Sequence, residues 1–288
     1  MKEKESKSGF VLLLGETNAG KSTLLNSILG EKVSIVSHKV QTTRLRILGI
    51  YTNNEAQIVF IDTPGIFNPK RSFDKEMVNL SYSQIVNADI ILFLVDANKG
   101  LTEQTKNIIA KIPKNKTNIF VFNKVDLIPK EKLLALVKGI EDLDKFAKVF
   151  MISALKKQGL KELLLYLQNN IPTDNWYFDS EQTTNLPEYQ QATEITQEQI
   201  YAQLHQELPY NICVEHLSWQ ELDEKIIIYQ NIYVSKDSYK GMILGKQGTK
   251  IKQIRIKATK AMVKQFHKNV ELHLHIKVND KWLYIKKT

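Results

Sequence analysis

The segment from Gly15 to Ser22 constrains the fold of this 288-residue chain more than any other. It reads GETNAGKS and matches the phosphate-binding pattern G-x4-G-K-[ST]. An apolar, strand-like run at 10–14 precedes it, and an amphipathic, helix-like stretch at 21–29 follows it. These flanks matter because the loop's backbone N–H groups and the N-terminus of the next helix bind phosphates together. A chance glycine-rich loop is the alternative, and both flanks argue against it. The sequence therefore predicts a P-loop nucleotide-binding domain.

Each residue type in this loop has a chemical reason to be there. Gly15 and Gly20 permit a tight turn that is partly left-handed. Lys21 can reach the outer phosphates as a point charge, and the Ser22 hydroxyl can bind a magnesium ion. The other nucleotide contacts expected from this segment come from Asn18, Ala19 and Thr23.

Two further segments indicate a site for magnesium and the γ-phosphate. DTPG at 62–65 follows an apolar run, so Asp62 is placed to hold magnesium through a water and Gly65 to offer its N–H to the γ-phosphate. QTTR at 41–44 supplies Thr43, whose hydroxyl can complete the magnesium shell only when the γ-phosphate is present. That property is typical of a nucleotide-dependent switch. A simple turn and an ordinary polar loop are the respective alternatives.

The segments NKVD at 123–126 and SAL at 153–155 indicate which base is bound. Asn123 is expected to brace the loop, and the stem of Lys124 to lie along the base. The Asp126 carboxylate matches the N1–H and N2–H₂ donors of guanine, which adenine lacks, so a buried Asp126 would select GTP over ATP. The SAL segment is expected to close over the base, with the N–H of its central alanine free to meet guanine O6. It consists of Ser153, Ala154 and Leu155.

The residue after DTPG leaves the hydrolytic step less well defined. Many GTPases carry a glutamine there that orients the attacking water, whereas this chain has Ile66. Because isoleucine cannot orient a water, hydrolysis must use another group, a cation or a partner, or be slow. The sequence names no general base, and the residues expected to act on the γ-phosphate are Lys21, Thr43 and Gly65.

Apolar runs alternate with amphipathic stretches as far as residue 171, which predicts a mostly parallel, doubly wound α/β sheet. The motifs lie where strands end, which is where open α/β sheets bind ligands. The predicted strands are 10–14, 58–61, 90–95, 119–123 and 149–152. The predicted helices are 21–29, 75–87, 102–111, 130–142 and 159–170. Polar residues 172–187 are predicted to link this domain, 1–171, to a second domain, 188–288.

The second domain is predicted to be small, α+β and basic. Its expected helices are 194–208 and 250–268, and its expected strands are 210–217, 225–235 and 270–278. The net charge of the chain is +9, and residues 236–288 hold 14 Lys and Arg against 3 Asp and Glu. This concentration predicts a polyanionic partner, nucleic acid first, with a solvated lysine-rich surface or anionic lipid as alternatives.

The motif GKQG at 245–248 favours nucleic acid. In KH modules a G-x-x-G loop clamps the backbone of unpaired nucleotides. Here the glycines would permit close approach and the lysine would meet phosphate. A helix cap is the alternative. The residues expected to contact RNA are Gly245, Lys246, Gln247, Gly248, Lys250 and Lys257.

The composition indicates in which cellular compartment the protein acts. The single cysteine, Cys213, excludes an intramolecular disulfide and suits a reducing cytosol. Apolar runs are too short to span a membrane. The predicted location is therefore the cytoplasm.

Taken together, these segments resemble the Era family of GTPases over nearly the whole chain. The most specific agreement lies in SHKVQTTRLRILGI at 37–50, ELPYNICVE at 207–215 and GMILGKQGTKIKQI at 241–254. The resemblance implies a bacterial ribosome-assembly GTPase that uses GTP or GDP and Mg²⁺ and carries a C-terminal type II KH domain. It implies binding to the 3′ end of small-subunit ribosomal RNA and assistance in maturation of the 30S subunit.

The resemblance also bears on Asn18 and on the surroundings of the protein. It implies that Asn18 acts in catalysis beside a potassium ion that replaces the missing glutamine, and a helix-cap asparagine is the alternative. The implied state is a monomer with peripheral association to anionic lipid on the inner face of the cell membrane. Two other functions stay open, an RNA-binding switch with negligible hydrolysis and a membrane-surface GTPase. A tandem GTPase is disfavoured because the chain has a single phosphate loop.

Overall fold

The computed structural model describes residues 6–35, 47–53, 55–67, 72–140, 142–204 and 212–279. These residues form two compact units. The first contains the described residues up to Ser34 and from Ile47 to Asn185, and the second contains Ile35 and the described residues from Leu186 onward. None of the helices in these ranges combines the length and apolar composition that a membrane span requires.

The first unit is built on a six-stranded sheet with the order β2-β3-β1-β4-β5-β6. All neighbouring strands are parallel except β2, which runs antiparallel to β3. The central strands are buried on both faces, which explains their continuous Val, Ile, Leu and Phe content. The strands are β1 Lys7–Gly15, β2 Ile47–Thr52, β3 Ala56–Asp62, β4 Ile90–Asp96, β5 Thr117–Asn123 and β6 Lys148–Met151.

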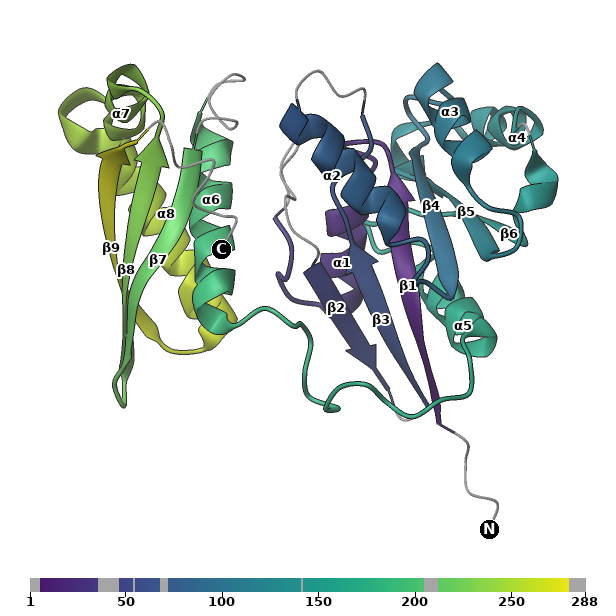
Figure 1. Ribbon diagram of the computed structural model, residues 1–288, viewed down its shortest axis with the longest axis horizontal. Coiled ribbons are helices and arrows are strands. Elements are labelled where there is room, and N and C mark those ends of the chain that lie inside the picture. The colour runs from purple at the N-terminus through teal and green to yellow at the C-terminus, as the bar shows by residue number, and fades with distance from the viewer. Residues whose placement is uncertain are drawn as a thin grey trace, which may run out of the picture. The chain divides into compact units, whose positions relative to one another are not determined.

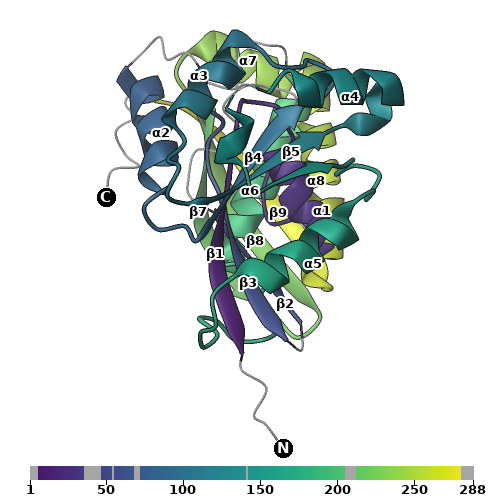
Figure 2. The ribbon, with the colours of Figure 1, turned by 90° about the vertical axis from the view of Figure 1, so that its right-hand side faces the viewer.

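Helices cover both faces of this sheet (Figures 1 and 2). Helices α1 (Lys21–Leu29) and α5 (Leu160–Asn170) lie on one face. The other face carries α2 (Ser72–Ser83), α3 (Glu103–Lys111) and α4 (Lys130–Lys138) over a core rich in phenylalanine. The prediction of a doubly wound α/β domain is therefore confirmed.

The edge strand β2 was not predicted. It begins three positions after the polar segment QTTR, and Gly49 interrupts its apolar pattern. A Cβ atom at Gly49 would meet the side chains of Leu25 and Leu29, so the glycine lets helix α1 pack closely on this strand. The reason for the glycine lies in helix packing, so local sequence gives no sign of it.

Residues 172–185, predicted as part of a linker, pack along the strands of the first unit. The Ile50 N–H donates to the carbonyl oxygen of Thr183 (2.7 Å). The Leu48 N–H donates to the side-chain oxygen of Asn185 (2.9 Å). The fully buried Gln57 side chain accepts hydrogen bonds from the backbone N–H groups of residues 177 and 178. This segment therefore belongs structurally to the first unit, whose last residue is Asn185.

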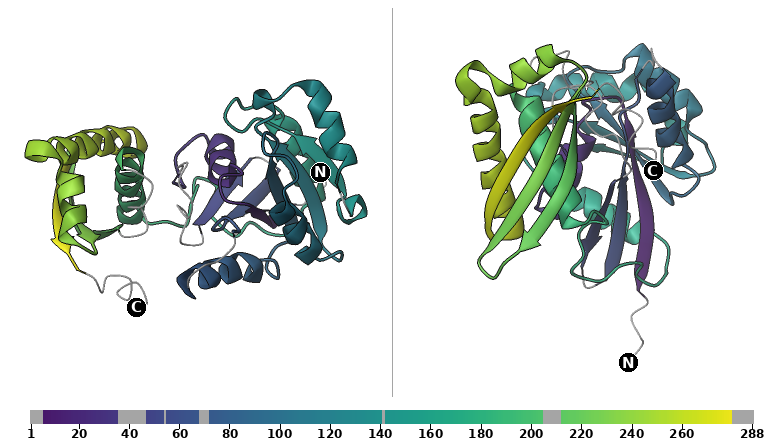
Figure 3. Two further views of the ribbon diagram at one scale, coloured as in Figure 1. Left: turned by 90° about the horizontal axis from the view of Figure 1, so that it is seen from above. Right: turned by 60° about the vertical axis from the view of Figure 1, so that its left-hand side comes forward.

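The second unit has a three-stranded sheet with the order β7-β8-β9, in which β7 is antiparallel and β9 parallel to β8. Figure 3 shows the strands side by side with the long helices behind them. Helices α6 and α8 pack on the sheet through a core that includes Ile195, Ile228 and Met262. The elements are α6 Glu188–Gln203, β7 Ile212–Glu221, β8 Lys225–Val234, α7 Asp237–Leu244, α8 Thr249–Phe266 and β9 Asn269–Val278.

The predicted α+β class of this unit is confirmed, with two differences. Helix α6 begins at Glu188 instead of 194, directly after Pro187, whose fixed φ suits a helix start. Helix α7 was not predicted, because its eight residues are few for a periodic signal and include Gly241. The predicted ends of the helix at 208 and of the strand at 210 lie outside the described residues.

Candidate functional site

The phosphate loop joins β1 to α1 and is shaped by residues with positive φ. Gly15 has φ 152°, Gly20 has φ 97° and Asn18 has φ 64°. A Cβ atom on Gly15 would overlap the carbonyl oxygen of Leu94, and one on Gly20 would overlap the Asn123 side chain. Both glycines are thus required by backbone conformation and by contacts from neighbouring strands.

Lys21 is buried beneath this loop, with a side chain only 6% exposed. Its Nζ donates to the carbonyl oxygens of Gly15 (3.1 Å) and Glu16 (3.0 Å). Burial lowers the pKa of Lys21 to about 8, because the charged form loses its hydration. Carbonyl oxygens carry only partial charge, so an anionic phosphate is the partner that would best compensate this buried cation.

Asp62, at the end of β3, forms the other charged centre of the site. Its Oδ2 accepts hydrogen bonds from the hydroxyls of Ser22 (2.8 Å) and Ser34 (2.7 Å). Its Oδ1 is buried and has no hydrogen-bond partner among the described residues. Burial raises the pKa of the Asp62 carboxyl. An unsatisfied buried carboxylate oxygen beside a serine hydroxyl fits Mg²⁺, which prefers hard oxygen ligands.

Ser34 was not singled out from the sequence, and Thr43 lies outside the described residues. Ser34 is 28 positions away from Asp62 in the chain, so no local pattern marks the pair. It is fully buried, and its contact to Asp62 is visible only in the fold.

The segment after Asp62 is fastened to the phosphate loop. A Cβ atom on Gly65 would lie 2.6 Å from Cα of Thr17, so only glycine fits there. The Ile66 N–H donates to the carbonyl oxygen of Gly15 (3.0 Å), and the Thr17 N–H donates to that of Ile66 (3.3 Å). Gln104 of α3 also donates to the Ile66 carbonyl oxygen (2.8 Å).

Asn123 links the phosphate loop to the two segments predicted to bind the base, NKVD and SAL. Its Nδ2 donates to the carbonyl oxygen of Ala19 (2.9 Å), and its Oδ1 accepts from the N–H groups of Lys124 (2.8 Å) and Ala154 (3.0 Å). The expected bracing role of Asn123 therefore has a clear geometry. The expectation that the Ala154 N–H is free for guanine O6 is wrong for this structure, because that N–H donates to Oδ1 of Asn123.

Asp126 is exposed in a short 3-10 helix, Val125–Leu127, whereas the sequence analysis took it to be buried. In this structure the Asp126 carboxylate is open to solvent, and a bound guanine base would shield it. Leu155 is also exposed, and the buried Ser153 accepts a hydrogen bond from the Lys156 N–H (3.1 Å).

Lys124 connects the base-binding end to the phosphate loop. It has φ 64°, and its Nζ contacts the carbonyl oxygen of Asn18 (2.7 Å) and Oδ2 of Asp96 (2.6 Å). Asp96 was missed in the sequence analysis. The signal that could have identified it is its position as the first acidic residue after the buried run at 90–95.

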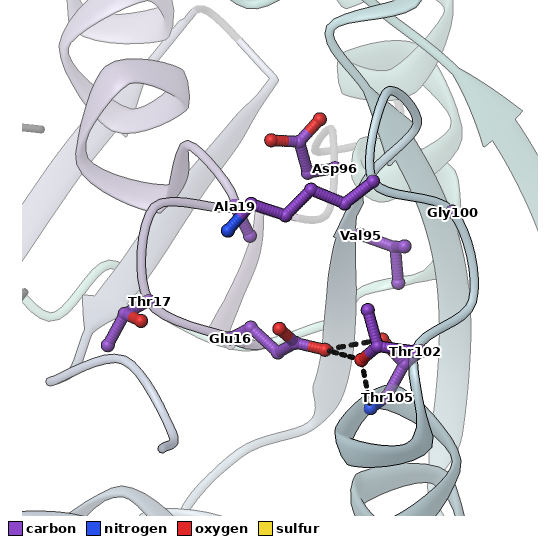
Figure 4. A pocket seen from close by; sticks show the side chains of 9 residues that line it. Glu16, Thr17, Ala19, Val95, Asp96, Gly100, Thr102 and Thr105 are labelled. Atoms are coloured by element: carbon purple, nitrogen blue, oxygen red, sulfur yellow. Dashed lines mark hydrogen bonds between the residues drawn. The ribbon is translucent and has the colours of Figure 1, made fainter.

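A small pocket beside the phosphate loop contains a second missed cluster (Figure 4). The Glu16 carboxylate accepts hydrogen bonds from the hydroxyls of Thr102 and Thr105. Thr102 also caps helix α3 by accepting from the Thr105 N–H (3.0 Å). Glu16 therefore anchors the phosphate loop to the start of α3.

The predicted RNA-contacting residues lie together in the second unit. The loop between α7 and α8 has positive φ at Gly245 (70°), Gln247 (52°) and Gly248 (74°). Gly245 is required by its neighbours, since a Cβ atom would lie 2.7 Å from Cβ of Lys250, whereas a Cβ atom on Gly248 would meet nothing within 4 Å. Lys246 and Gln247 are exposed at the loop, and Lys257 is exposed further along α8.

Helix α8 has a buried apolar face and exposed lysines. Ile254, Ala258 and Met262 are fully buried against the sheet. Lys257, Lys260 and Lys264 are exposed. The helix therefore presents cations to solvent beside the glycine-containing loop.

Comparison with known proteins connects both units to characterised families. The family described as 50S ribosome-binding GTPase matches residues 10–124, and the KH domain family matches residues 207–283. GTPase Era of Rhizobium meliloti (strain 1021) is 44% identical over 279 residues, which is 96% of this chain and 89% of the relative. GTPase Era of Brucella suis biovar 1 (strain 1330) is 42% identical over 280 residues, covering 96% of this chain and 90% of the relative.

Two solved structures match both units with a TM-score of 0.91. One is Era in complex with MgGDPNP and nucleotides 1506–1542 of 16S ribosomal RNA, and the other is a variant of Aquifex aeolicus Era bound to GDP·AlF₄⁻. Each is 36% identical to this chain, and each match covers 96% of this chain and 95% of the solved one. Because sequence and fold agree over nearly the entire length, this chain belongs to the Era family of GTPases.

Proposed function

We propose that this GTPase binds the 3′ end of small-subunit ribosomal RNA and assists maturation of the 30S subunit under the control of its bound nucleotide. In this proposal residues 1–171 bind and hydrolyse GTP, with residues 172–185 packed on the same unit, and residues 188–288 bind RNA. The observation that carries the proposal is a phosphate loop and an exposed basic G-x-x-G helix in one chain. The relative solved with MgGDPNP and a 16S ribosomal RNA fragment supports it.

Nucleotide binding would draw on the charges described above. The loop from Gly15 to Thr23 would surround the phosphates, with Lys21 supplying the positive charge. Ser22 and Asp62 would hold Mg²⁺, and Thr43 would join them when the γ-phosphate is present. The ion would neutralise charge on the outer phosphates during transfer to water. Asp126 would accept hydrogen bonds from guanine, with Lys124 and the SAL segment around the base.

The hydrolytic step would depend on positioning by Lys21 and by the N–H of Gly65. Ile66 cannot orient the attacking water, because its side chain is apolar and almost fully buried. A role of Asn18 beside a potassium ion stays a prediction. Single-turnover hydrolysis in potassium and in sodium buffer tests it, and equal rates in the two buffers would contradict it.

RNA binding would combine a glycine-containing loop that clamps the nucleotide backbone with lysines that attract its phosphates. Gly245 and Gly248 would let the nucleotide backbone approach closely, while Lys246 and Gln247 contact it. Lys250 and Lys257 on α8 would extend the basic surface toward the next phosphates. Salt sensitivity follows, because each neutralised phosphate releases counterions.

Sequencing the RNA that copurifies with the protein tests this function directly. The protein is held with a non-hydrolysable GTP analogue, and the double variant Lys246→Glu with Lys257→Glu serves as the control. The expected result is enrichment of the 3′ end of small-subunit ribosomal RNA in the unaltered protein alone. Equal enrichment in both, or recovery of unrelated RNA only, would contradict the proposal.

A monomeric state, a cytoplasmic location and peripheral association with anionic membrane are further predictions. Flotation with vesicles containing phosphatidylserine, with and without competing RNA, tests the membrane prediction. No finding favours the two alternatives, a switch with negligible hydrolysis or a dedicated membrane-surface GTPase.

A further inference from the structure

A groove of about 320 Å³ lies between α2 and α3 on the first unit. Both helices cover the same face of the six-stranded sheet (Figure 2). Its apolar lining includes Val78 together with Ile66 and Ile108, which are almost fully buried. The groove opens at the protein surface, so a molecule from solvent can reach it. It reaches the lower end of the roughly 300–1,000 Å³ range of ligand pockets.

The rim of the groove is positively charged. Lys75 comes from α2 and Lys111 from α3, and both are exposed. Nζ of Lys111 lies 5.2 Å from the centre of the Tyr82 ring, so the cation is held beside an aromatic wall. Neither lysine forms an ion pair with another described residue, and no acidic side chain among those residues lines the groove. An anion would therefore find two available cations there.

The groove is connected to the phosphate loop by a short chain of hydrogen bonds. Gln104 lines the groove and donates to the carbonyl oxygen of Ile66 (2.8 Å). That oxygen also accepts from the Thr17 N–H, and the Ile66 N–H donates to Gly15. A ligand that shifts Gln104 or Ile66 would thus shift the backbone that surrounds the phosphates.

We propose that this α2–α3 groove binds a small anionic molecule with an apolar body, such as an aromatic carboxylate or sulfonate, and that its occupation changes nucleotide affinity. The volume corresponds to roughly ten water molecules, which suits one small molecule. The apolar body would contact Val78 and Ile108, and the anion would meet Lys75 and Lys111. By thermodynamic linkage, nucleotide must change the affinity of the groove by the same factor.

Titration with 1-anilinonaphthalene-8-sulfonate, an apolar monoanion, tests the site. The protein is first saturated with GDP, so that the nucleotide pocket is filled. We expect saturable one-to-one fluorescence enhancement, with Kd raised at least tenfold in the double variant Lys75→Glu with Lys111→Glu. The variant Asn107→Trp, which fills the groove from an exposed position, should abolish binding.

The matched control is Lys132→Glu on α4, an exposed lysine that does not line the groove. It should bind the probe as the unaltered protein does, and circular dichroism verifies that all variants fold. The same titration curve in all four proteins would overturn the proposed site, as would full binding in Asn107→Trp.

Calorimetry of GDP binding with and without saturating probe tests the coupling. We expect at least a threefold change in the Kd of GDP, matched by the change that GDP causes in the Kd of the probe. Gln104→Leu, measured at a probe concentration that saturates this variant, should lose the coupling. An unchanged Kd of GDP in the presence of the probe would overturn the coupling. Neither measurement involves RNA, so a negative result in these titrations is distinct from a failure of the proposed RNA-binding function.

Discussion

At the scale of single residues, two buried groups of opposite charge define the nucleotide pocket. Burial lowers the pKa of Lys21 to about 8 and raises that of Asp62. Each disfavoured charge has a natural compensating ion, phosphate for the lysine and magnesium for the carboxylate. Both ions arrive together when magnesium nucleotide binds.

Nucleotide affinity should fall as pH rises through the pKa of Lys21. Phosphate binding needs the protonated amine, which dominates below pH 8 and is lost above it. For a pKa of about 8, the apparent Kd should increase about tenfold between pH 7 and pH 9. Calorimetric titration of GDP across this range checks the prediction, with Lys21→Arg as the control, since its guanidinium stays charged. A flat profile in the unaltered protein would show that Lys21 does not titrate there.

Asp126→Asn should exchange guanine specificity for xanthine specificity. The amide cannot accept both guanine donors, and hydrogen bonds to a charged group contribute about 1.5–3 kcal/mol. GTP affinity should therefore fall about 10- to 100-fold while xanthosine triphosphate affinity rises. Because Asp126 is exposed, the thermal midpoint of unfolding should not move. Unchanged GTP affinity in a competition assay would remove the guanine assignment.

The sequence identifies those site residues whose role depends on local geometry. Gly15, Gly20 and Asn123 belong to short motifs, so their spacing alone reveals them. Ser34 and Asp96 do not, because their contacts to Asp62 and Lys124 join distant parts of the chain. The exposure of Asp126 also depends on how its loop sits on the fold.

At the scale of elements, strands and helices with long periodic patterns could be predicted, and short or interrupted ones could not. The buried runs that form β3, β4 and β5 are continuous in the sequence. Edge strand β2 contains a glycine that serves helix α1, and α7 has only eight residues. In β2 a contact with a distant helix overrides the local pattern, whereas α7 is too short to show a clear period.

Helix α8 should contribute to stability through its buried face alone. Met262 is fully buried, so Met262→Ala should lower the free energy of unfolding of the second unit by about 2–5 kcal/mol. Lys260→Ala, two positions away and exposed, should change it by no more than about 0.5 kcal/mol. Urea denaturation followed by circular dichroism measures both. Equal effects would show that α8 does not pack as described.

At the scale of the whole molecule, the phosphate loop and the G-x-x-G loop reside on separate units. Gly245→Asp with Gly248→Asp should abolish binding of single-stranded RNA in a filter-binding assay. Gly245 has a backbone conformation (φ 70°, ψ 178°) that essentially only glycine adopts, so aspartate would distort the loop. The added carboxylates would also repel the phosphates of the RNA. Hydrolysis of GTP should be retained, because the first unit is unaltered. Unchanged RNA affinity would remove the clamp.

The attachment of residues 172–185 to the first unit has a mechanical consequence. Since Asn185 is held to Leu48 and α6 starts at Glu188, about three peptide units of this segment, instead of sixteen residues, are left between the anchored part and α6. Such a joint reaches roughly 10 Å at full extension. A pull on the start of α6 would therefore reach strand β2 through these few peptide units.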